Sequence, residues 1–525
     1  MKLTHDIQQA FRLHKNKPAL SRYITSKSFQ TISYGELDAK VHGVARFLSE
    51  HGMKPGDLVA SYMNKSIDLA VVILATIING GVACALNPRF KSHQVVTLAS
   101  VARPKFIIVD KNTSSSLAHV SEAALGSQVV LHAEHMEIIQ LSKAGDFHNA
   151  VKGKGVSLPS SYHADDAGYC LFTSGSTGEQ KGVLISRDDL LERVKTEIED
   201  YQVTCTDHLL SLLPFSFDVG LNQFLSSILS GSHLVILNSW FPKDVIAAIR
   251  LFEITGISAV PTIWADMLCY PKERSFGEDI KTLRYITVSG GDLAQKYLVQ
   301  LKQYFEKVDI YKTYGQSETF RSGILKPRDF SNKMTSVGQP VKGTRIFILQ
   351  ENGHLAPPDG EGEIIHYGAG TMIRYINNGV VGAQEKLRDI PESLRSTLRE
   401  GKVVYTGDRG KIDSEGFLYV LGREDGMIKT LGFRVYPREV ENCILGHTLV
   451  KHAAVVGISD NRKGQSLIAE IVAKDTLDEG EVTTYIRERL PYYMVPDEIY
   501  IVDSLPLAEN GKIRYAEIKA KHEQR

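Results

Sequence analysis

A loop rich in small hydroxyl residues and glycine has the composition of an anion-binding site. Residues 171–186 read LFTSGSTGEQKGVLIS. Hydroxyls and backbone N–H groups between glycines can converge on one phosphate, because glycine lets the backbone approach closely and adopt positive φ. The apolar runs on both sides of the loop argue against a solvated linker. We therefore expect a polyphosphate-binding loop formed by Thr173, Ser174, Gly175, Ser176, Thr177, Gly178 and Lys181.

This loop differs from the P-loop of nucleotide hydrolases, because Lys181 is followed by Gly182 and not by serine or threonine. It resembles the phosphate-binding motif of the adenylate-forming superfamily, which includes acyl-CoA synthetases, amino-acid adenylation domains of peptide synthetases, and luciferases. The family usually has proline before the lysine. Here Gln180 takes that place, which removes a rigid position but no group with a chemical role.

Four further segments follow in the order that the superfamily requires. They are YGQSET at 314–319, YTGD at 405–408, GRED at 422–425 with its continuation to Glu441, and PLAENGKIRY at 506–515. Together with segments 32–47 and 80–90, the resemblance covers nearly the whole chain. It implies an AMP-forming ligase that uses ATP and Mg²⁺ to convert a carboxylic acid to an acyl-adenylate, releases pyrophosphate, and then forms a thioester.

The resemblance also implies roles for single residues, and the residue types permit these roles. Charge that develops during attack on the α-phosphorus needs Mg²⁺ and a nearby cation. Glu318 suits Mg²⁺ as a hard oxygen ligand, Asp408 suits the two ribose hydroxyls, and Tyr314 offers a flat face to adenine. Arg423 is expected at the ribose or α-phosphate, and Lys512 at the carboxylate and α-phosphate. We expect Lys512, Glu318 and Arg423 to be catalytic, and Gly315 and Thr319 to join the nucleotide contacts.

The segment 214–224, PFSFDVGLNQF, bears on the identity of the acid. Amino-acid adenylation domains carry Phe-Asp here, and that aspartate pairs with the substrate α-ammonium. Asp218 fits this role, since a carboxylate beside Phe215 and Phe217 would be partly desolvated and its ion pair strong. The alternative is a helix N-cap. By resemblance, the acid pocket would be lined by Asp218, Val219, Asn222, Ser258, Thr287, Ser289, Thr313, Arg321 and Ser322.

Most of these pocket residues are small and polar, which favours a small amino acid. If Arg321 fills the cavity, glycine or alanine is favoured; alternatively, Arg321 pairs with a second carboxylate or another anion of a larger substrate. The chain ends at Arg525, soon after the lysine loop. We therefore expect transfer to the phosphopantetheine thiol of a separate carrier protein.

Two other functions are weighed against this expectation. One is an acyl-CoA or aryl-CoA ligase for a small carboxylic acid, with CoA as the thiol acceptor. The other is a nucleotide-binding protein that has lost catalysis. The presence of all the expected catalytic and nucleotide-binding residues argues against it: Lys181, Glu318, Asp408, Arg423 and Lys512.

Predicted strands and helices, which must hold these residues in place, alternate along the chain. Short β-branched runs at 58–62, 106–109, 128–131, 234–237, 256–260, 285–288 and 308–311 are separated by amphipathic stretches. This pattern predicts an α/β fold with parallel sheets flanked by helices. Glycine punctuation after residue 339 predicts a β-rich subdomain. We expect a large N-terminal domain, 1–424, and a small mobile α+β lid, 425–525.

The resemblance places the hinge of this lid at Asp425. It further implies that rotation about this residue brings residues 432–434 to the site for the thioester step. Within the lid we expect a helix at 437–445, strands at 453–458 and 466–472, and a helix at 482–490.

The amino-acid composition argues against several other kinds of partner and site. Basic and acidic residues balance at 61 each, so nothing points to nucleic acid or an anionic membrane as a partner. The five cysteines include no Cys-x-x-Cys pair, which argues against zinc or a disulfide framework and fits a reducing cytoplasm. The longest apolar stretch, 69–86, is broken at Gly80 and Gly81. A buried helix, a turn and a strand therefore fit better there than a membrane span.

Overall fold

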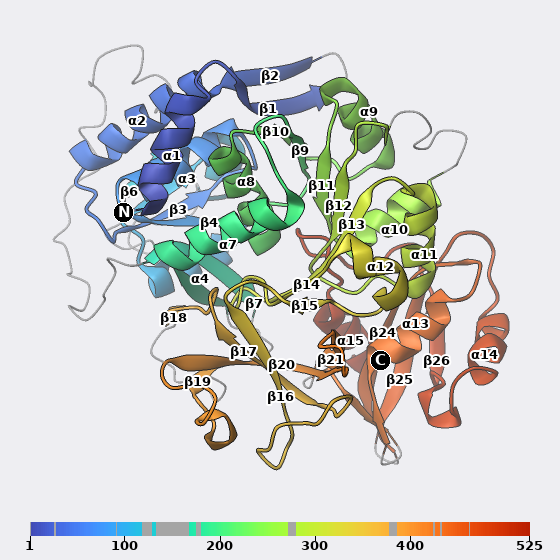
Figure 1. The fold of residues 1–525 in the computed structure, drawn as a ribbon. Helices are drawn as coiled ribbons and strands as arrows, with labels where there is room; N and C mark the ends of the chain where they lie inside the picture. Colours follow the sequence, from blue (N-terminus) through green and yellow to red (C-terminus); the bar gives the residue numbers. More distant parts are fainter. Residues whose placement is uncertain are drawn as a thin grey trace.

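The protein is described here from a computed structural model. The structure describes residues 2–25, 28–90, 92–117, 129–132, 167–174, 180–270, 280–376, 386–423, 426–430, 433–460 and 463–524. Its large N-terminal part is built on β-sheets with helices on their faces, and a smaller C-terminal part lies beside it (Figure 1). This is the predicted α/β class.

The first sheet carries the strands that lead to the acid segment and to the YGQSET motif. Its order is β15-β14-β13-β12-β11-β9-β10-β1-β2, with β13, β12, β11, β9, β10 and β1 parallel. The strands are β1 (Pro18–Thr25), β2 (Ser28–Ser33), β9 (His208–Ser211), β10 (His233–Ile236), β11 (Gly256–Ala259), β12 (Tyr285–Val288), β13 (Asp309–Tyr314), β14 (Gly323–Leu325) and β15 (Gln339–Pro340).

The second sheet carries the phosphate loop. Its order is β18-β8-β7-β4-β3-β5-β6, and β7, β4, β3, β5 and β6 are parallel to one another. Strand β8 pairs antiparallel with β7, and β18 pairs antiparallel with β8. The strands are β3 (Leu58–Tyr62), β4 (Val82–Ala85), β5 (Phe106–Val109), β6 (Val129–His132), β7 (Ala167–Ser174), β8 (Gln180–Ser186) and β18 (Arg374–Ile376). The loop connects β7 to β8 as a hairpin.

Helices pack between and around these sheets. They are α1 (Lys2–Leu13), α2 (Tyr34–Glu50), α3 (Ile67–Ile78), α4 (Ser92–Ala102), α5 (Lys111–Leu117), α7 (Arg187–Tyr201), α8 (Asp218–Ser230), α9 (Pro242–Phe252), α10 (Pro261–Cys269), α11 (Gln295–Tyr304) and α12 (Pro327–Lys333). Helix α3 is buried along almost its whole length, as expected for a helix that is apolar on all sides. The apolar stretch 69–86 therefore forms a core helix, a turn and β4.

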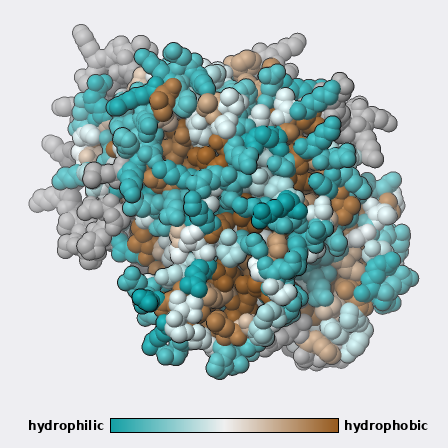
Figure 2. All heavy atoms as spheres, viewed as in Figure 1, coloured by the Kyte–Doolittle hydropathy of each residue, from teal (hydrophilic) through white to brown (hydrophobic). Residues whose placement is uncertain are grey.

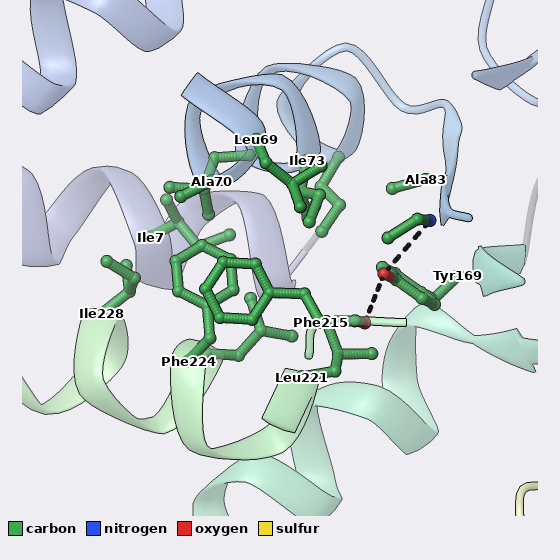
Figure 3. Packing of buried hydrophobic residues seen from close by; sticks show 14 of the residues in the cluster. Ile7, Leu69, Ala70, Ile73, Ala83, Tyr169, Phe215, Leu221, Phe224 and Ile228 are labelled. Atoms are coloured by element: carbon green, nitrogen blue, oxygen red, sulfur yellow. Dashed lines mark hydrogen bonds between the residues drawn. The ribbon is translucent and has the colours of Figure 1, made fainter. Parts of the chain in front are cut away.

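The core joins the two sheets through α3 and α8. Leu69 and Ile73 of α3 point toward Phe224 and Ile228 of α8 (Figure 3). One buried cluster includes these residues together with side chains of both sheets. The face seen in Figure 2 is mostly hydrophilic, with apolar side chains visible in its recesses. Within the described ranges, none of the helices combines the length and apolarity that crossing a membrane requires.

A third sheet forms the predicted β-rich subdomain. Its strands are antiparallel, in the order β16-β17-β20-β19, and β21 pairs with β20. They are β16 (Thr344–Leu349), β17 (Gly362–Gly368), β19 (Leu387–Asp389), β20 (Lys402–Ile412) and β21 (Leu418–Arg423). A 3-10 turn, Glu392–Leu394, precedes β20.

The C-terminal part is a separate α+β unit. Its sheet has the order β23-β22-β25-β24, and β26 lies parallel to β25. Its elements are β22 (Ile428–Thr430), β23 (Phe433–Val435), α13 (Pro437–Leu445), β24 (Val450–Asp460), β25 (Gly464–Ala473), α14 (Glu479–Arg487), the 3-10 turn Tyr492–Met494, β26 (Glu498–Ile501) and α15 (Tyr515–Glu523). Helix α14 starts earlier than predicted because Asp478 caps it by accepting from the Glu481 N–H.

The C-terminal part packs against α10 and α11 through ion pairs and backbone contacts (Figure 1). Arg438 of α13 lies 2.6 Å from Asp292. Lys451 of β24 lies 2.8 Å from Asp266 of α10. These contacts hold the C-terminal part against the N-terminal part.

Candidate active site

A small cavity lies where the first sheet, α8 and the lysine loop meet. Its volume is about 20 Å³, roughly the space of one water molecule. The lining residues are Phe217, Asp218, Val219, Asn222, Gly290, Thr313, Tyr314, Gly315, Phe320, Arg321 and Lys512.

Tyr169 connects the strand before the phosphate loop to the acid segment. Its hydroxyl donates to the Phe215 carbonyl at 2.9 Å and accepts the Ala85 N–H at 3.4 Å (Figure 3). Phe215 in turn stacks on Phe224 of α8, with ring centroids 4.6 Å apart. The nucleotide side and the acid side thus share one rigid core.

Asp408 stands at the centre of the nucleotide side. Tyr314 Oη and Gln316 Nε2 each donate to its Oδ2 at 2.7 Å. Arg423 Nη1 lies 3.9 Å from its Oδ1, because β20 and β21 place the two residues opposite each other. The Gln316 N–H donates to Thr319 Oγ1. Tyr314 and Gln316 of the YGQSET motif, Asp408 of YTGD and Arg423 of GRED therefore lie together in the structure.

Glu318 lies beside two residues that the sequence analysis missed. Tyr375 Oη donates to Glu318 Oε1 at 2.8 Å, and Lys386 Nζ lies 3.1 Å from the same oxygen. Burial by itself would raise the pKa of Glu318, but Lys386 and Tyr375 outweigh that effect and hold it below its ordinary value. Tyr375 and Lys386 flank a segment without any recognisable motif, so only their position in space reveals them.

Parts of the predicted phosphate loop can be placed. The backbones of Thr173 and Ser174 end β7 and pair with Lys181 and Gln180 of β8. Lys181 Nζ lies 5.5 Å from the centre of the Tyr375 ring, and the hydroxyl of Tyr375 donates to Glu318. The remaining loop residues Gly175, Ser176, Thr177 and Gly178, and the expected hinge Asp425, lie outside the described residues.

The lysine loop docks closely on the N-terminal part. Thr262 Oγ1 donates to the Gly511 carbonyl at 2.8 Å. Gly511 has φ of +78°, and a Cβ at this position would lie 2.7 Å from Val260 Cγ2. Glycine therefore meets both the backbone and the packing requirement. The docking places Lys512 Nζ 5.0 Å from the centre of the Phe217 ring, at the edge of the cavity.

Asp218 is the first residue of α8 and not its N-cap, since Phe217 occupies that position. Its Oδ1 accepts the Val219 N–H at 2.9 Å. Burial raises the pKa of the Asp218 carboxyl, while Lys512, the Val219 N–H and Arg321 oppose the shift. Asp218 is thus a buried acidic residue that lines the cavity.

Arg321 already has a carboxylate partner in the protein. Its guanidinium bonds to Glu197 of α7, which also accepts from Asn222 Nδ2. Burial raises the pKa of Glu197, and Arg321 opposes this, while Tyr201 and Glu197 raise the pKa of Arg321. Sequence analysis left open whether Arg321 fills the pocket or pairs with a substrate anion. It missed Glu197, because a glutamate on an amphipathic helix reads as a surface residue.

Four predicted pocket residues do not line the cavity. Ser258 and Thr287 are opposite each other on β11 and β12. Ser289 lies 3.1 Å from Thr287 Oγ1 and 2.7 Å from Thr313 Oγ1, so it supports Thr313, which does line the cavity. Ser322 Oγ lies 3.0 Å from His366 Nδ1.

Known proteins resemble this chain over nearly its whole length. It is 26% identical to the dimodular nonribosomal peptide synthase of Bacillus subtilis (strain 168) over 92% of its own residues, but it spans only 19% of that protein. It is 26% identical to 2-succinylbenzoate–CoA ligase of Bacillus subtilis (strain 168), covering 93% of each chain. The solved structure of o-succinylbenzoate coenzyme A synthetase from Bacillus subtilis in complex with ATP and magnesium ion matches with a TM-score of 0.77 at 25% identity, covering 98% of this chain and 99% of that one.

Family models agree with these similarities. The AMP-binding enzyme model matches residues 7–376, and the model of the AMP-binding enzyme C-terminal domain matches residues 439–512. The first match alone covers more than half of the chain. Combined with the converging motifs, it shows that this chain belongs to the AMP-binding enzyme family and is an adenylate-forming ligase.

Proposed function

We propose that this enzyme uses ATP and Mg²⁺ to adenylate a small carboxylic acid that carries an amino group, and then transfers the acyl group to the thiol of CoA. One observation carries the choice of acid. Glu197 and Arg321 pair with each other, which leaves Asp218 and Lys512 at the cavity as one negative and one positive group. A zwitterion complements both, whereas an acid without an amino group leaves Asp218 without a cationic ligand group.

On the nucleotide side, the proposed roles follow the geometry. Asp408 would bind the ribose hydroxyls, with its orientation fixed by Tyr314 and Gln316. Arg423 would support the ribose or the α-phosphate. The phosphate loop from Thr173 to Lys181 would bind the pyrophosphate portion of ATP.

Glu318 fits the proposed magnesium role. Tyr375 and Lys386 both contact Oε1, and the lowered pKa of Glu318 keeps the carboxylate charged, as a magnesium ligand must be. When bound, the metal would supply charge neutralisation on the phosphates. Lys386 orients Glu318 and also donates to Gln316 Oε1 at 2.7 Å.

Lys512 would stabilise the charge that develops as the carboxylate attacks the α-phosphorus. Its loop is fixed on the N-terminal part through Gly511 and Thr262. For the thioester step we retain the division into 1–424 and a mobile lid, 425–525, with the hinge at Asp425. In that step the Arg438–Asp292 and Lys451–Asp266 contacts would have to break.

CoA is preferred as acceptor because the 2-succinylbenzoate–CoA ligase matches this chain along the length of both proteins. This is the alternative that the sequence analysis weighed, and it has the better support. A carrier-protein phosphopantetheine is the second candidate, favoured by the 26% identity to a segment of a nonribosomal peptide synthase.

The test is pyrophosphate–ATP exchange with matched acids: glycine against acetate, alanine against propionate, and anthranilate against benzoate. We expect the aminated member of an active pair to exceed its partner by about tenfold or more in kcat/KM. A preference for the unaminated acids would overturn the amino-bearing assignment. AMP formation with CoA, compared with a phosphopantetheinylated carrier protein, then decides the acceptor.

A further inference from the structure

Three charged residues form a row that joins strand β13 to helix α13 of the C-terminal part. Lys312 of β13 is 1% exposed, and its Nζ lies 3.1 Å from Asp292 Oδ1. Arg438 of α13 places Nε and Nη2 at 3.0 and 2.6 Å from Asp292 Oδ2, and its Nη1 donates to the Val420 carbonyl at 2.7 Å. Each oxygen of Asp292 thus serves one cation, and this carboxylate pairs with both parts of the protein at once.

The Asp292 carboxylate stays charged in this position. Burial by itself would raise the pKa of Asp292, but Lys312 and Arg438 outweigh burial and hold it below its ordinary value. Lys312 belongs to the N-terminal part and also donates to the Met334 carbonyl at 3.0 Å. Asp292 and Lys312 therefore form a pair within the N-terminal part. Arg438 is the member of the row whose contacts depend on the orientation of the C-terminal part.

The segment that carries Asp292 also reaches the active-site cavity. Gly290, two residues earlier, lines this cavity together with Lys512. A Cβ placed on Gly290 would lie 3.2 Å from Lys512 Cε, so the backbone and the lysine side chain approach closely. One short segment of the N-terminal part thus contacts the C-terminal part at two points, Lys512 and Arg438. A change at one point therefore affects the geometry at the other.

The interface around this row is polar and partly hollow. Within the described ranges, the buried apolar clusters of the C-terminal part consist of its own residues, and the partly buried Leu445 packs against clusters of both parts. A hollow of about 590 Å³ lies between α11 and α13, beside Asp292 and Arg438. The Lys451–Asp266 pair of the same interface is 31% and 37% exposed, and such exposed pairs contribute little. The doubly bonded, less exposed Arg438 should contribute more.

We propose that Arg438 is a positioning residue for adenylation: bound to Asp292, which Lys312 holds in place, it keeps the C-terminal part in the orientation that brings Lys512 to the active-site cavity. Lys312 keeps Asp292 paired when Arg438 leaves, so the acceptor is ready when Arg438 returns. The thioester step, in which this contact has to break, does not depend on Arg438. This inference rests on the proposed function and names residues that balance its two half-reactions.

The experiment compares Arg438→Gln with the wild-type enzyme in single turnovers of each half-reaction. The acid is the one that the wild-type enzyme uses best among the matched pairs of the exchange test. We expect the rate constant of adenylation to fall by about tenfold or more, because hydrogen bonds to a charged group are lost. Thioester formation from preformed acyl-adenylate should stay the same or rise. Unchanged adenylation, or an equal loss in both half-reactions, would overturn the inference, since a merely structural role predicts equal loss.

Two further variants make the comparison sharper. Lys451→Gln removes the exposed ion pair of the same interface and should change each half-reaction by no more than about twofold. Arg438→Lys keeps the charge but not the planar set of donors, so it should restore part of the adenylation rate. A loss in Lys451→Gln as large as in Arg438→Gln would contradict the special role of the row.

Tryptophan fluorescence tests the positioning without any acid. The chain has two tryptophans. Trp264 is 1% exposed, whereas Trp240 is partly buried beside the lysine loop, where a Cβ on Gly511 would lie 3.9 Å from Trp240 Cη2. In the free protein, Arg438→Gln should therefore increase the quenching of Trp240 by acrylamide while the melting curve stays cooperative.

Unchanged quenching in the folded Arg438→Gln protein would overturn the inference. Absence of pyrophosphate–ATP exchange with every carboxylic acid tested would instead refute the proposed function. The quenching measurement still decides the role of Arg438 in that case, because it needs no substrate.

Discussion

The nucleotide side and the acid side of this site are constructed differently. On the nucleotide side, Tyr314 and Gln316 belong to one motif and Asp408 to another, and their side chains meet directly. On the acid side, Asp218 and Asn222 come from α8, Glu197 from α7, and Arg321 follows β13. The nucleotide side therefore consists of short continuous segments, whereas the acid side consists of single positions from several elements.

This difference has a physical origin. ATP presents the same phosphates and ribose diol to every enzyme that binds it, so the same closely spaced groups serve it. The acid is recognised by the balance of charge in a small buried space. That balance depends on residues such as Glu197, which acts only through its partners. If the two sides are independent, a variant on one side should leave the other unchanged.

The largest effect is expected where the two sides meet. Lys512→Ala removes a cation from the transition state and should lower adenylation by about a hundredfold to a thousandfold. Thioester formation from preformed acyl-adenylate should change much less. Single-turnover measurement of each half-reaction checks this. Equal loss in both half-reactions would contradict a role limited to adenylation.

Asp218→Ala isolates the acid side. The substrate ammonium would lose its buried partner, which costs about 3–5 kcal/mol, so kcat/KM for the amino acid should fall by about a hundredfold or more. The KM for ATP should stay the same. Exchange kinetics with each substrate varied in turn provide the measurement. A parallel loss of ATP affinity would show that the two sides are coupled.

Asp408→Asn is the corresponding experiment on the nucleotide side. Hydrogen bonds to charged groups contribute about 1.5–3 kcal/mol, so the KM for ATP should rise by about tenfold to a hundredfold. The ranking of acids in the exchange panel should not change. A changed ranking would indicate that Asp408 also shapes the acid cavity through Tyr314.

The smallest effect concerns pH. Burial raises the pKa of Asp218, and the charged form is the one that pairs with an ammonium. Activity with the amino acid should therefore be retained above this raised pKa and lost as the pH falls through it, by several-fold before ATP binding weakens. Profiles of kcat/KM against pH measure this. The Asp218→Asn variant should have a low kcat/KM that no longer falls at acidic pH. If kcat/KM of the variant still fell in the same pH range, the titrating group would be a residue other than Asp218.

The sequence by itself determined the family, the nucleotide motifs and much of the local structure. The strands Leu58–Tyr62, Phe106–Val109 and Tyr285–Val288 and the helix Pro437–Leu445 agree with prediction residue for residue. These segments carry their own signals, such as buried β-branched runs or a proline at the helix start. Convergence of the YGQSET and YTGD motifs followed from resemblance alone.

Only the tertiary structure decided what surrounds these motifs. Arg321 and Glu197 are 124 positions apart, and Lys386 and Gln316 are 70 apart. No local pattern marks either pair, because burial gives these charges their importance and burial is a property of the assembled fold. The sequence named Arg321 as a pocket residue, but the structure identified its partner and therefore the charge that the substrate meets.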